Sequence, residues 1–211
     1  DLKKKPIWIH CKGYLVRDDN MKPLYMIGCV NEIGERQKAD NVSGLLGESG
    51  FREYMNQQDT PLETGYLLRI GIDHFKEIND NFGLEYGDFV LKKTAECISG
   101  CISEGPKVYK LVADEFLILD VSSDEAKDAD KLYDKVREAI DRFIETNEFK
   151  VMYTVSGGIV PFAALKENQC SEALKLTDFA LNEAKKLGRN RCYIFNGETY
   201  RKFLRKREIT Q

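Results

Sequence analysis

Few residues of this chain are of the kinds that build metal centres or disulfide frameworks. There are two histidines, at positions 10 and 74, and six scattered cysteines that form no CxxC pair. A zinc site of cysteine and histidine therefore has few ligands available, and the low cysteine content suggests a reducing, cytoplasmic location. Cys97 and Cys101 would share one face of a helix. We interpret them as small buried thiols, with a redox or metal pair as the alternative.

Long apolar runs and an excess of basic charge are also missing. No apolar run approaches the ~18 residues of a membrane span, so we predict no membrane segment in this chain. The 32 Lys and Arg residues against 35 Asp and Glu give a net charge of −3, without the basic surplus that a nucleic-acid backbone attracts. The chain begins at Asp1 with neither Met nor a signal peptide. We therefore expect a piece of a longer protein, which could be tethered to a membrane upstream.

The composition indicates a folded chain of more than one domain's length. Hydrophobic residues make up 42% of the sequence and charged residues 32%, which is enough apolar sequence to fill a core. At about 150 residues per domain, the length of 211 residues indicates one complete domain and a partial one. We place the partial domain with its linker at residues 1–40, the complete domain at 41–196, and a C-terminal helix or connector at 197–211.

The first segment reads as a β-hairpin. Residues 7–16 (IWIHCKGYLV) and 23–30 (PLYMIGCV) have the character of strands and flank a turn rich in Asp and Asn. A hairpin alone is marginal in water, so this one packs on something or is part of a larger sheet. Residues 31–40 read as a polar linker with helical potential.

The remaining sequence alternates strand and helix patterns in the order β-α-β-β-α-β, with an α-β extension. Two helices that cross one antiparallel sheet form a ferredoxin-like split βαβ core, so we predict an α/β sandwich of this type. Strands are expected at 65–72, 107–112, 115–121, 149–160 and 192–195, and helices at 73–82, 87–103, 124–147 and 173–187.

Several motifs of this segment resemble the GGDEF family of diguanylate cyclases. Residues 73–91 read DHFKEINDNFGLEYGDFVL, where the family shows DxDxFKxxNDxxGHxxGDxxL. Residues 40–51 (DNVSGLLGESGF) are similar to its opening DxLTGLxNRxxF, residues 156–159 (SGGI) to its SxGI strand, and residues 184–191 (AKKLGRNR) to its AKxxGRN segment. The resemblance covers residues 40–196 in order and spacing, and implies the nucleotidyl-cyclase palm form of the ferredoxin-like fold.

The resemblance also implies a reaction and its requirements. Members of the family join two GTP molecules into cyclic di-GMP between two facing domains, so a homodimer is expected in the full-length protein. Such phosphoryl chemistry uses divalent metals, and Mg²⁺ prefers carboxylate oxygens. The family supplies one Asp at the end of the first strand and a second carboxylate from the third position of its GGDEF signature.

This sequence departs from the family at those positions. Gly71 stands where the first-strand Asp is expected, and the signature reads Val112-Ala113-Asp114-Glu115-Phe116. Asp114 and Glu115 keep the catalytic positions of the family, but Val112 and Ala113 replace the two glycines. A β-branched residue fits poorly where φ is positive, and we expect its methyl groups to obstruct the phosphates. Loss of metal stabilisation worth several kcal/mol means a rate about a thousandfold lower.

One alternative metal pair remains in the sequence. Asp73 lies two residues after Gly71 and would point to the same side if the strand stays extended. Asp73 and Asp114 are therefore the tentative Mg²⁺ ligands. The sequence implies no other cofactor.

The residues matched to nucleotide recognition are retained. The resemblance assigns guanine to Asn79 and Asp88, and the phosphates to Lys76, Lys185 and Arg189. A carboxylate can accept the N1 and N2 protons of guanine, and an amide can both donate and accept. In the alternative interpretation, the polar residues cap helices and the cations lie on a solvated surface.

Three further segments each allow a prediction. The family's RxxD inhibitory motif falls on Ser103-Glu104-Gly105-Pro106, so no inhibitory site for cyclic di-GMP is expected. Residues 22–36 resemble the last strands of a PAS sensor domain. Residues 200–207 (YRKFLRKR) read as a basic helix that is either a solvated tail or a connector, for example to an EAL-type phosphodiesterase.

Three functions follow from these patterns. The first is a catalytically inactive GGDEF-like module that regulates a neighbouring sensor or phosphodiesterase domain, with GTP as a candidate ligand. The second is an active or weakly active diguanylate cyclase that uses Asp73 and Asp114. The third is a dimerisation scaffold that binds no nucleotide.

Overall fold

The structure is a computed structural model in which the chain forms two compact units, Asp1–Ala39 and Asp40–Gln211. Residues 34–38 of the linker predicted at 31–40, the matched residues Ser103 and Glu104, and the start of the strand expected at 149–160 lie outside the described residues. The described residues are 8–18, 20–33, 39–58, 62–102, 105–123, 126–146, 151–165 and 170–209.

The first unit contains the predicted hairpin, which is confirmed. Strand β1 (Trp8–Arg17) pairs antiparallel with β2 (Pro23–Ile33), which runs further than the strand expected at 23–30. The turn is held by Asp18, whose carboxylate oxygen accepts hydrogen bonds from the backbone N–H groups of Asn20 at 2.9 Å and Lys22 at 2.8 Å. The origin of this hairpin in a PAS domain stays a prediction.

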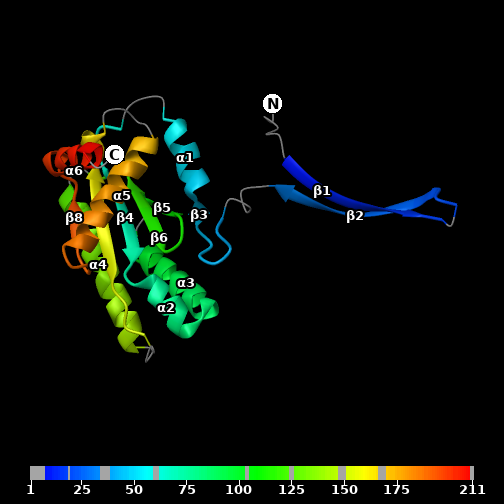
Figure 1. Cartoon of the computed structure of the whole chain (residues 1–211), viewed down its shortest axis with the longest axis horizontal. Helices are drawn as coiled ribbons and strands as arrows, with labels where there is room; N and C mark the ends of the chain where they lie inside the picture. Colours follow the sequence, from blue (N-terminus) through cyan, green and yellow to red (C-terminus); the bar gives the residue numbers. More distant parts are fainter. Residues whose placement is uncertain are drawn as a thin grey trace. The chain divides into compact units, whose positions relative to one another are not determined.

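A six-stranded sheet forms the centre of the second unit (Figure 1). Its four central strands are antiparallel in the order β5-β6-β4-β7, which is the predicted ferredoxin-like core. The two edge strands, β3 and the extension strand β8, run parallel to their neighbours, so the sheet as a whole is mixed. The strands are β3 (Leu46–Gly47), β4 (Tyr66–Ile72), β5 (Lys107–Lys110), β6 (Glu115–Asp120), β7 (Val155–Pro161) and β8 (Cys192–Ile194).

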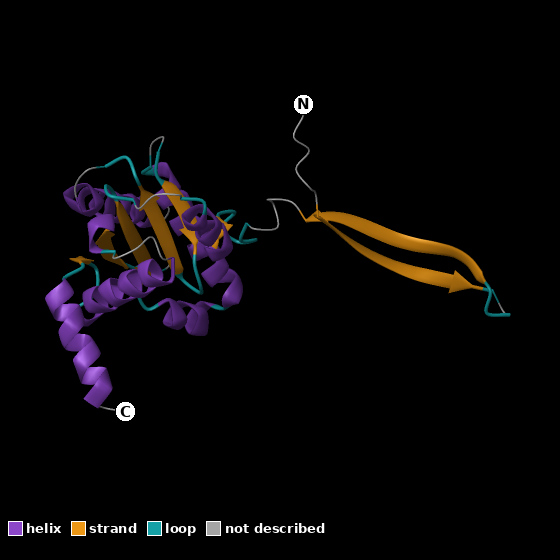
Figure 2. Ribbon diagram, turned by 90° about the horizontal axis from the view of Figure 1, so that it is seen from above, coloured by secondary structure: helices purple, strands orange, loops and turns teal. Residues whose placement is uncertain are grey.

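Helices lie on both sides of this sheet, as Figure 2 shows. Alternate residues of a strand face opposite sides. In β4, Leu68 and Ile70 therefore join the core beneath α3 and α4, whereas Leu67 joins a second core with α1 and α5. Arg69 and Gly71 share the side of Leu67, which brings both toward α5. The helices are α1 (Glu48–Asn56), α2 (Phe75–Phe82), α3 (Leu84–Gly100), α4 (Ala126–Thr146), the short 3₁₀ turn η2 (Phe162–Ala164), α5 (Cys170–Lys186) and α6 (Gly197–Ile209).

Some element boundaries differ from the sequence prediction. Helix α1 was not predicted, although its buried Phe51 and Met55 have the i, i+4 spacing of a helix face. Strand β7 begins only at Val155, because residues 151–154 follow an irregular path beside α2 and α4. The expected C-terminal helix is present as α6, and it packs on α5, with the Phe179 ring 4.9 Å from that of Tyr200 and 5.2 Å from that of Phe203.

Cys97 of α3 and Cys101, the C-cap residue of the same helix, are free thiols that face α4. The Sγ of Cys97 donates to the Ala139 carbonyl at 3.9 Å, and the Sγ of Cys101 to the Lys135 carbonyl at 3.5 Å. Burial raises the pKa of Cys97 to about 11. Among the described residues, no group of three or more His, Cys, Asp or Glu side chains is placed to hold a metal ion. Nor does any helix in the described ranges have the length and apolar character needed to cross a membrane.

Candidate nucleotide-binding site

The signature residues form the tip of the β5–β6 hairpin. The N–H of Leu111 donates to the Glu115 carbonyl at 2.8 Å, and the N–H of Glu115 donates to the Val112 carbonyl at 3.3 Å. The positive φ that this tip needs, 54°, falls on Ala113 and not on Val112. Our expectation of backbone strain at the β-branched residue is therefore wrong, because Val112 does not have a positive φ, and the residue is 71% exposed.

The strain at Ala113 gives a stability prediction. A left-handed conformation costs a non-glycine residue about 1–2 kcal/mol, whereas glycine adopts it freely. Because glycine also gains freedom in the unfolded chain, we expect Ala113→Gly to raise the free energy of unfolding by about 0.5–1 kcal/mol. Urea denaturation measures this change. The matched control is Val112→Gly, which relieves no strain and should lower stability; equal effects of the two substitutions would contradict the assignment.

A buried lysine supports the same tip. Lys110 is only 5% exposed, and its ammonium donates to the carbonyls of Leu111, at 2.9 Å, and of Ala113. Burial lowers the pKa of Lys110, while the negative charges of Asp40, Asp114 and Glu115 oppose the shift. Lys110 was not among the predicted site residues. The sequence could have indicated Lys110, because it is a charged residue inside the largely apolar run KVYKLV.

Glu115, the fourth signature residue, is engaged by Arg69 of β4. The Arg69 Nε donates to Glu115 Oε2 at 2.8 Å, and a second guanidinium nitrogen also contacts this oxygen. The same guanidinium donates to the Leu174 carbonyl at 3.2 Å and lies 3.6 Å from Asp178 of α5. The side chains of Arg69 and Glu115 are 12% and 18% exposed. Arg69 was also missed by the sequence prediction, although it is the one charge within the strand YLLRIGI.

Gly71 pairs with Glu115 of β6 and with Ser156 of β7, so it lies beside the hairpin tip. A Cβ at Gly71 would lie 3.1 Å from the Lys185 ammonium and 3.1 Å from Leu181. The ammonium of Lys185 is also 3.9 Å from Glu115 Oε1. Lys185 thus occupies the space that an Asp side chain at position 71 would enter.

Asp114 is the remaining carboxylate at this tip. Burial raises the pKa of Asp114, while the positive charge of Lys185 opposes the shift. The structure therefore gathers Asp114, Glu115 and Lys185 of the predicted site around Gly71.

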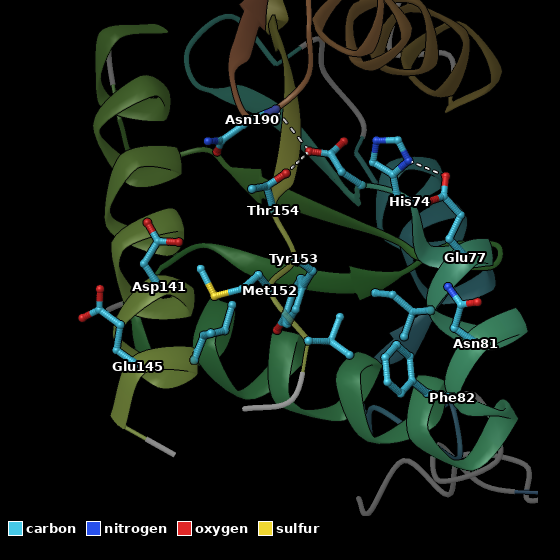
Figure 3. A pocket seen from close by; sticks show the side chains of 14 residues that line it. His74, Glu77, Asn81, Phe82, Asp141, Glu145, Met152, Tyr153, Thr154 and Asn190 are labelled. Atoms are coloured by element: carbon cyan, nitrogen blue, oxygen red, sulfur yellow. Dashed lines mark hydrogen bonds and ion pairs between the residues drawn. The ribbon is translucent and has the colours of Figure 1, made fainter. Parts of the chain in front are cut away.

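Asp73 has a different environment. The residue is 2% exposed, and both of its carboxylate oxygens accept hydrogen bonds. The hydroxyls of Thr154 and Ser156 donate at 2.7 Å each, and the backbone N–H of Asn190 donates at 3.1 Å. Figure 3 shows Thr154 and Asn190 on one side of a pocket, with dashed lines to this carboxylate. Asp73 therefore links the end of β4 to β7 and to the α5–β8 loop.

This linkage positions a second predicted site residue. Arg189 and Asn190 both have positive φ, 60° and 47°, at the point where the chain leaves α5. The hydrogen bond from Asn190 to Asp73 holds this turn against the sheet. Arg189 is exposed, on the turn that follows Lys185.

The predicted guanine-binding residues lie where α2 meets α3. A Cβ at Gly87 would lie only 1.8 Å from the Asn79 side-chain oxygen, so the Asn79 amide rests on the first turn of α3. Asp88 follows Gly87 and is exposed, as is Lys76 on α2. Residue 87 must therefore be glycine, because Asn79 approaches it so closely. This contact places the Asn79 amide next to Gly87, the neighbour of Asp88 in the sequence.

A pocket of about 560 Å³ lies between α2, α4 and residues 151–154 (Figure 3). Acidic side chains from α2 and α4 border it, with Glu77 on one side and Asp141 and Glu145 on the other. Asp73 alone of the predicted site residues lines it. The predicted nucleotide-binding residues therefore lie outside this pocket.

Comparison with known proteins agrees with this fold and these motifs. Residues 38–191 match the family described as "Diguanylate cyclase, GGDEF domain". The chain belongs to the GGDEF family, whose domains act in cyclic di-GMP signalling. It is 32% identical over 152 residues to the probable diguanylate cyclase DgcT of Escherichia coli K12, covering 68% of this chain and 32% of the relative. It is 30% identical over 165 residues to the cyclic di-GMP phosphodiesterase NbdA of Pseudomonas aeruginosa, covering 74% of this chain and 20% of the relative.

Solved structures show the same architecture. The GGDEF domain of DgcB from Caulobacter crescentus, solved in complex with c-di-GMP, superposes with a TM-score of 0.67 at 22% identity, covering 77% of this chain and 98% of that one. The active GGEEF domain of a diguanylate cyclase from Vibrio cholerae gives a TM-score of 0.57 at 27% identity, covering 70% and 93%. The chain spans between a fifth and about half the length of the first curated relatives it matches.

Proposed function

We propose that this GGDEF domain binds GTP without converting it to cyclic di-GMP and regulates a neighbouring domain. The observation that carries the proposal is the set of charges around Gly71. Where the family places a carboxylate, this chain has Gly71, which offers no side-chain ligand, and Glu115 is held by Arg69. Asp114 is then the one signature carboxylate without a guanidinium partner among the described contacts, which is too little for metal-assisted phosphoryl transfer.

The presence of both residues assigned to guanine supports the proposed binding of GTP. Asn79 and Asp88 lie at the junction of α2 and α3, where an exposed carboxylate and an amide can meet the edge of a base. Lys185, Arg189 and Lys76 supply positive charge for the phosphates. Adenine lacks the N1–H and N2–H₂ donors that a carboxylate accepts, so this pair favours guanine.

One relative supports the proposed regulation of a neighbouring domain. The segment matched in NbdA makes up 20% of a protein named a cyclic di-GMP phosphodiesterase. A module of this kind, joined to a phosphodiesterase or a sensor, could report the concentration of GTP through a change of its own conformation. The expected homodimer of the full-length protein gives such a change a route to a partner domain.

Binding of GTP is tested by calorimetric titration of the 211-residue chain. We expect micromolar affinity, weaker affinity for ATP, and a loss of about tenfold to a hundredfold in Asp88→Ala, because a hydrogen bond to a charged group contributes about 1.5–3 kcal/mol. The control is Asp80→Ala, an exposed carboxylate of α2 that should leave binding unchanged. Equal binding by Asp88→Ala would exclude the assigned guanine site, and absence of GTP binding would favour the dimerisation scaffold.

Absence of turnover is tested separately. Incubation with GTP and Mg²⁺ or Mn²⁺, followed by chromatography of the products, should yield no cyclic di-GMP above the buffer control. Formation at ordinary enzyme rates would contradict the proposal and support the alternative of an active cyclase.

A further inference from the structure

We propose that the pocket between α2, α4 and residues 151–154 is a docking site for a basic amphipathic helix of a partner protein. The pocket has a volume of about 560 Å³ and lies apart from the predicted nucleotide-binding residues. The proposed interaction therefore does not depend on GTP binding.

Apolar side chains form the base and the edge of this pocket. Ile78, Ile144 and Tyr153 line it and belong to the buried core beneath it. Phe82 and Met152 also line it, but these two residues are 46% and 83% exposed (Figure 3). Methionine is flexible and polarizable, and it is common on surfaces that adapt to different apolar partners. An apolar side chain that enters the pocket would therefore contact core residues at the base and exposed apolar residues at the edge.

The rim of the pocket is acidic on both sides. Glu77 borders it from α2, and Asp141 and Glu145 border it from α4, one helical turn apart (Figure 3). The carboxylate of Asp73 lies deeper and is held by its three hydrogen-bond donors. Of the described residues that line the pocket, four carry a carboxylate and none is Lys or Arg. A rim of this charge attracts Lys and Arg and repels phosphates and acidic segments.

The rim carboxylates are available to a partner. Within the part of the chain that the structure describes, neither Asp141 nor Glu145 has a hydrogen bond or an ion pair. Arg142, the next residue after Asp141, lines a different cavity beside α3. Glu77 lies 2.6 Å from the Nδ1 of His74, but both side chains are more than half exposed, so this carboxylate also meets water. Each rim carboxylate can therefore accept a hydrogen bond from a cation of a bound segment.

A basic amphipathic helix matches both parts of this surface. A helix in a groove inserts the apolar residues of one face and carries its charged residues along the flanks. Cations one turn apart on such a helix would match Asp141 and Glu145, which have the same spacing on α4. A polyamine could pair with the carboxylates, but it would leave Phe82 and Met152 in water. The partner favoured by the combined surface is therefore a helix with both Lys or Arg and large apolar residues.

Binding is tested by fluorescence anisotropy with the 211-residue chain and a labelled amphipathic helix of Leu and Lys, about 14 residues long. We expect micromolar affinity that weakens with added salt. The same peptide with Glu in place of every Lys should not bind. Equal binding of the two peptides, or no binding of the Lys peptide at millimolar concentration, would overturn the proposal. Displacement of the Lys peptide by spermine as effective as that by unlabelled peptide would also overturn it, because the pocket would then bind cations without an apolar contribution.

Variants of exposed residues locate the binding on the molecule. In Asp141→Asn/Glu145→Gln, affinity for the Lys peptide should fall about tenfold, because two charge pairs are lost. The matched control is Asp134→Asn/Glu138→Gln, which changes the same residue types at the same spacing on α4, outside this pocket, and should leave affinity unchanged. Met152→Gln should weaken binding about fivefold through loss of apolar contact. Equal losses in the two double variants, or no effect of Met152→Gln, would show attraction to acidic surface in general and refute the proposal.

Discussion

The triple variant Gly71→Asp, Val112→Gly, Ala113→Gly is expected to form cyclic di-GMP from GTP and Mg²⁺, at a rate at least a hundredfold above the unaltered chain. Asp at position 71 restores the missing carboxylate beside Asp114. The glycines restore an open hairpin tip and remove the left-handed alanine. Metal stabilisation worth several kcal/mol corresponds to about a thousandfold in rate, of which we expect the larger part to return.

The neighbours of Gly71 can give way to an Asp side chain. The atoms that a Cβ at Gly71 would meet are the ends of two flexible side chains, Lys185 and Leu181, each at 3.1 Å. Both can move by a few tenths of an ångström, and the new carboxylate would gain an ion pair with Lys185. Products are resolved by chromatography, and Asp114→Ala in the triple background is the control that should abolish them. A folded triple variant that binds GTP and makes no product would place the defect elsewhere, for example in the geometry of the dimer.

Gly158→Ala is expected to cost about 3 kcal/mol or more of unfolding free energy, which is at or above the upper range for overpacking in a core. A Cβ at Gly158 of β7 would lie 2.3 Å from the backbone nitrogen of Leu181 and 2.7 Å from the carbonyl carbon of Ala180. These atoms belong to the backbone of α5, so no rotamer change relieves the clash and the whole helix must move. Because α5 also carries Lys185, GTP binding should weaken at the same time.

Denaturation in urea and thermal melting measure the effect of Gly158→Ala. For a unit of this size, 3 kcal/mol corresponds to a melting temperature lower by about 6–12 °C. The matched control is Gly100→Ala, at the last residue of α3, where a new Cβ meets nothing within 4 Å and helix propensity should add about 0.5–1 kcal/mol. A loss below 1 kcal/mol in Gly158→Ala would show that α5 shifts at little cost.

The sequence was sufficient to predict most elements of the fold. The helix patterns over 73–82, 87–103 and 124–147 correspond to α2, α3 and α4, because amphipathic spacing is a local property. The two short elements β3 and α1 were missed, since β3 has only two residues and the large buried side chains of α1, Phe51 and Met55, are a single helical turn apart. The direction of the edge strands was not predicted either, because strand direction depends on the path of the chain between distant segments.

For the candidate site, the sequence could identify which residues differ from the family but not what replaces them. The absent carboxylate at Gly71 and the altered Val112-Ala113 pair are visible by alignment of motifs. The strain at Ala113 rather than Val112 follows from the hydrogen bonds of the hairpin, which fix each φ angle. The motif alone therefore identified the hairpin tip as the altered segment, but it assigned the backbone strain to Val112 instead of Ala113.

By itself, the sequence determined that this chain is a GGDEF domain with an incomplete signature, since motif order and spacing are properties of the chain alone. Only the tertiary structure decided how the remaining charges are used. Arg69 meets Glu115 and Lys185 meets Gly71 because β4 lies between β6 and β7 with α5 packed on one face. Electrostatic interactions depend on distance in space, so residues far apart in sequence acquire their roles only when the sheet brings them within a few ångströms.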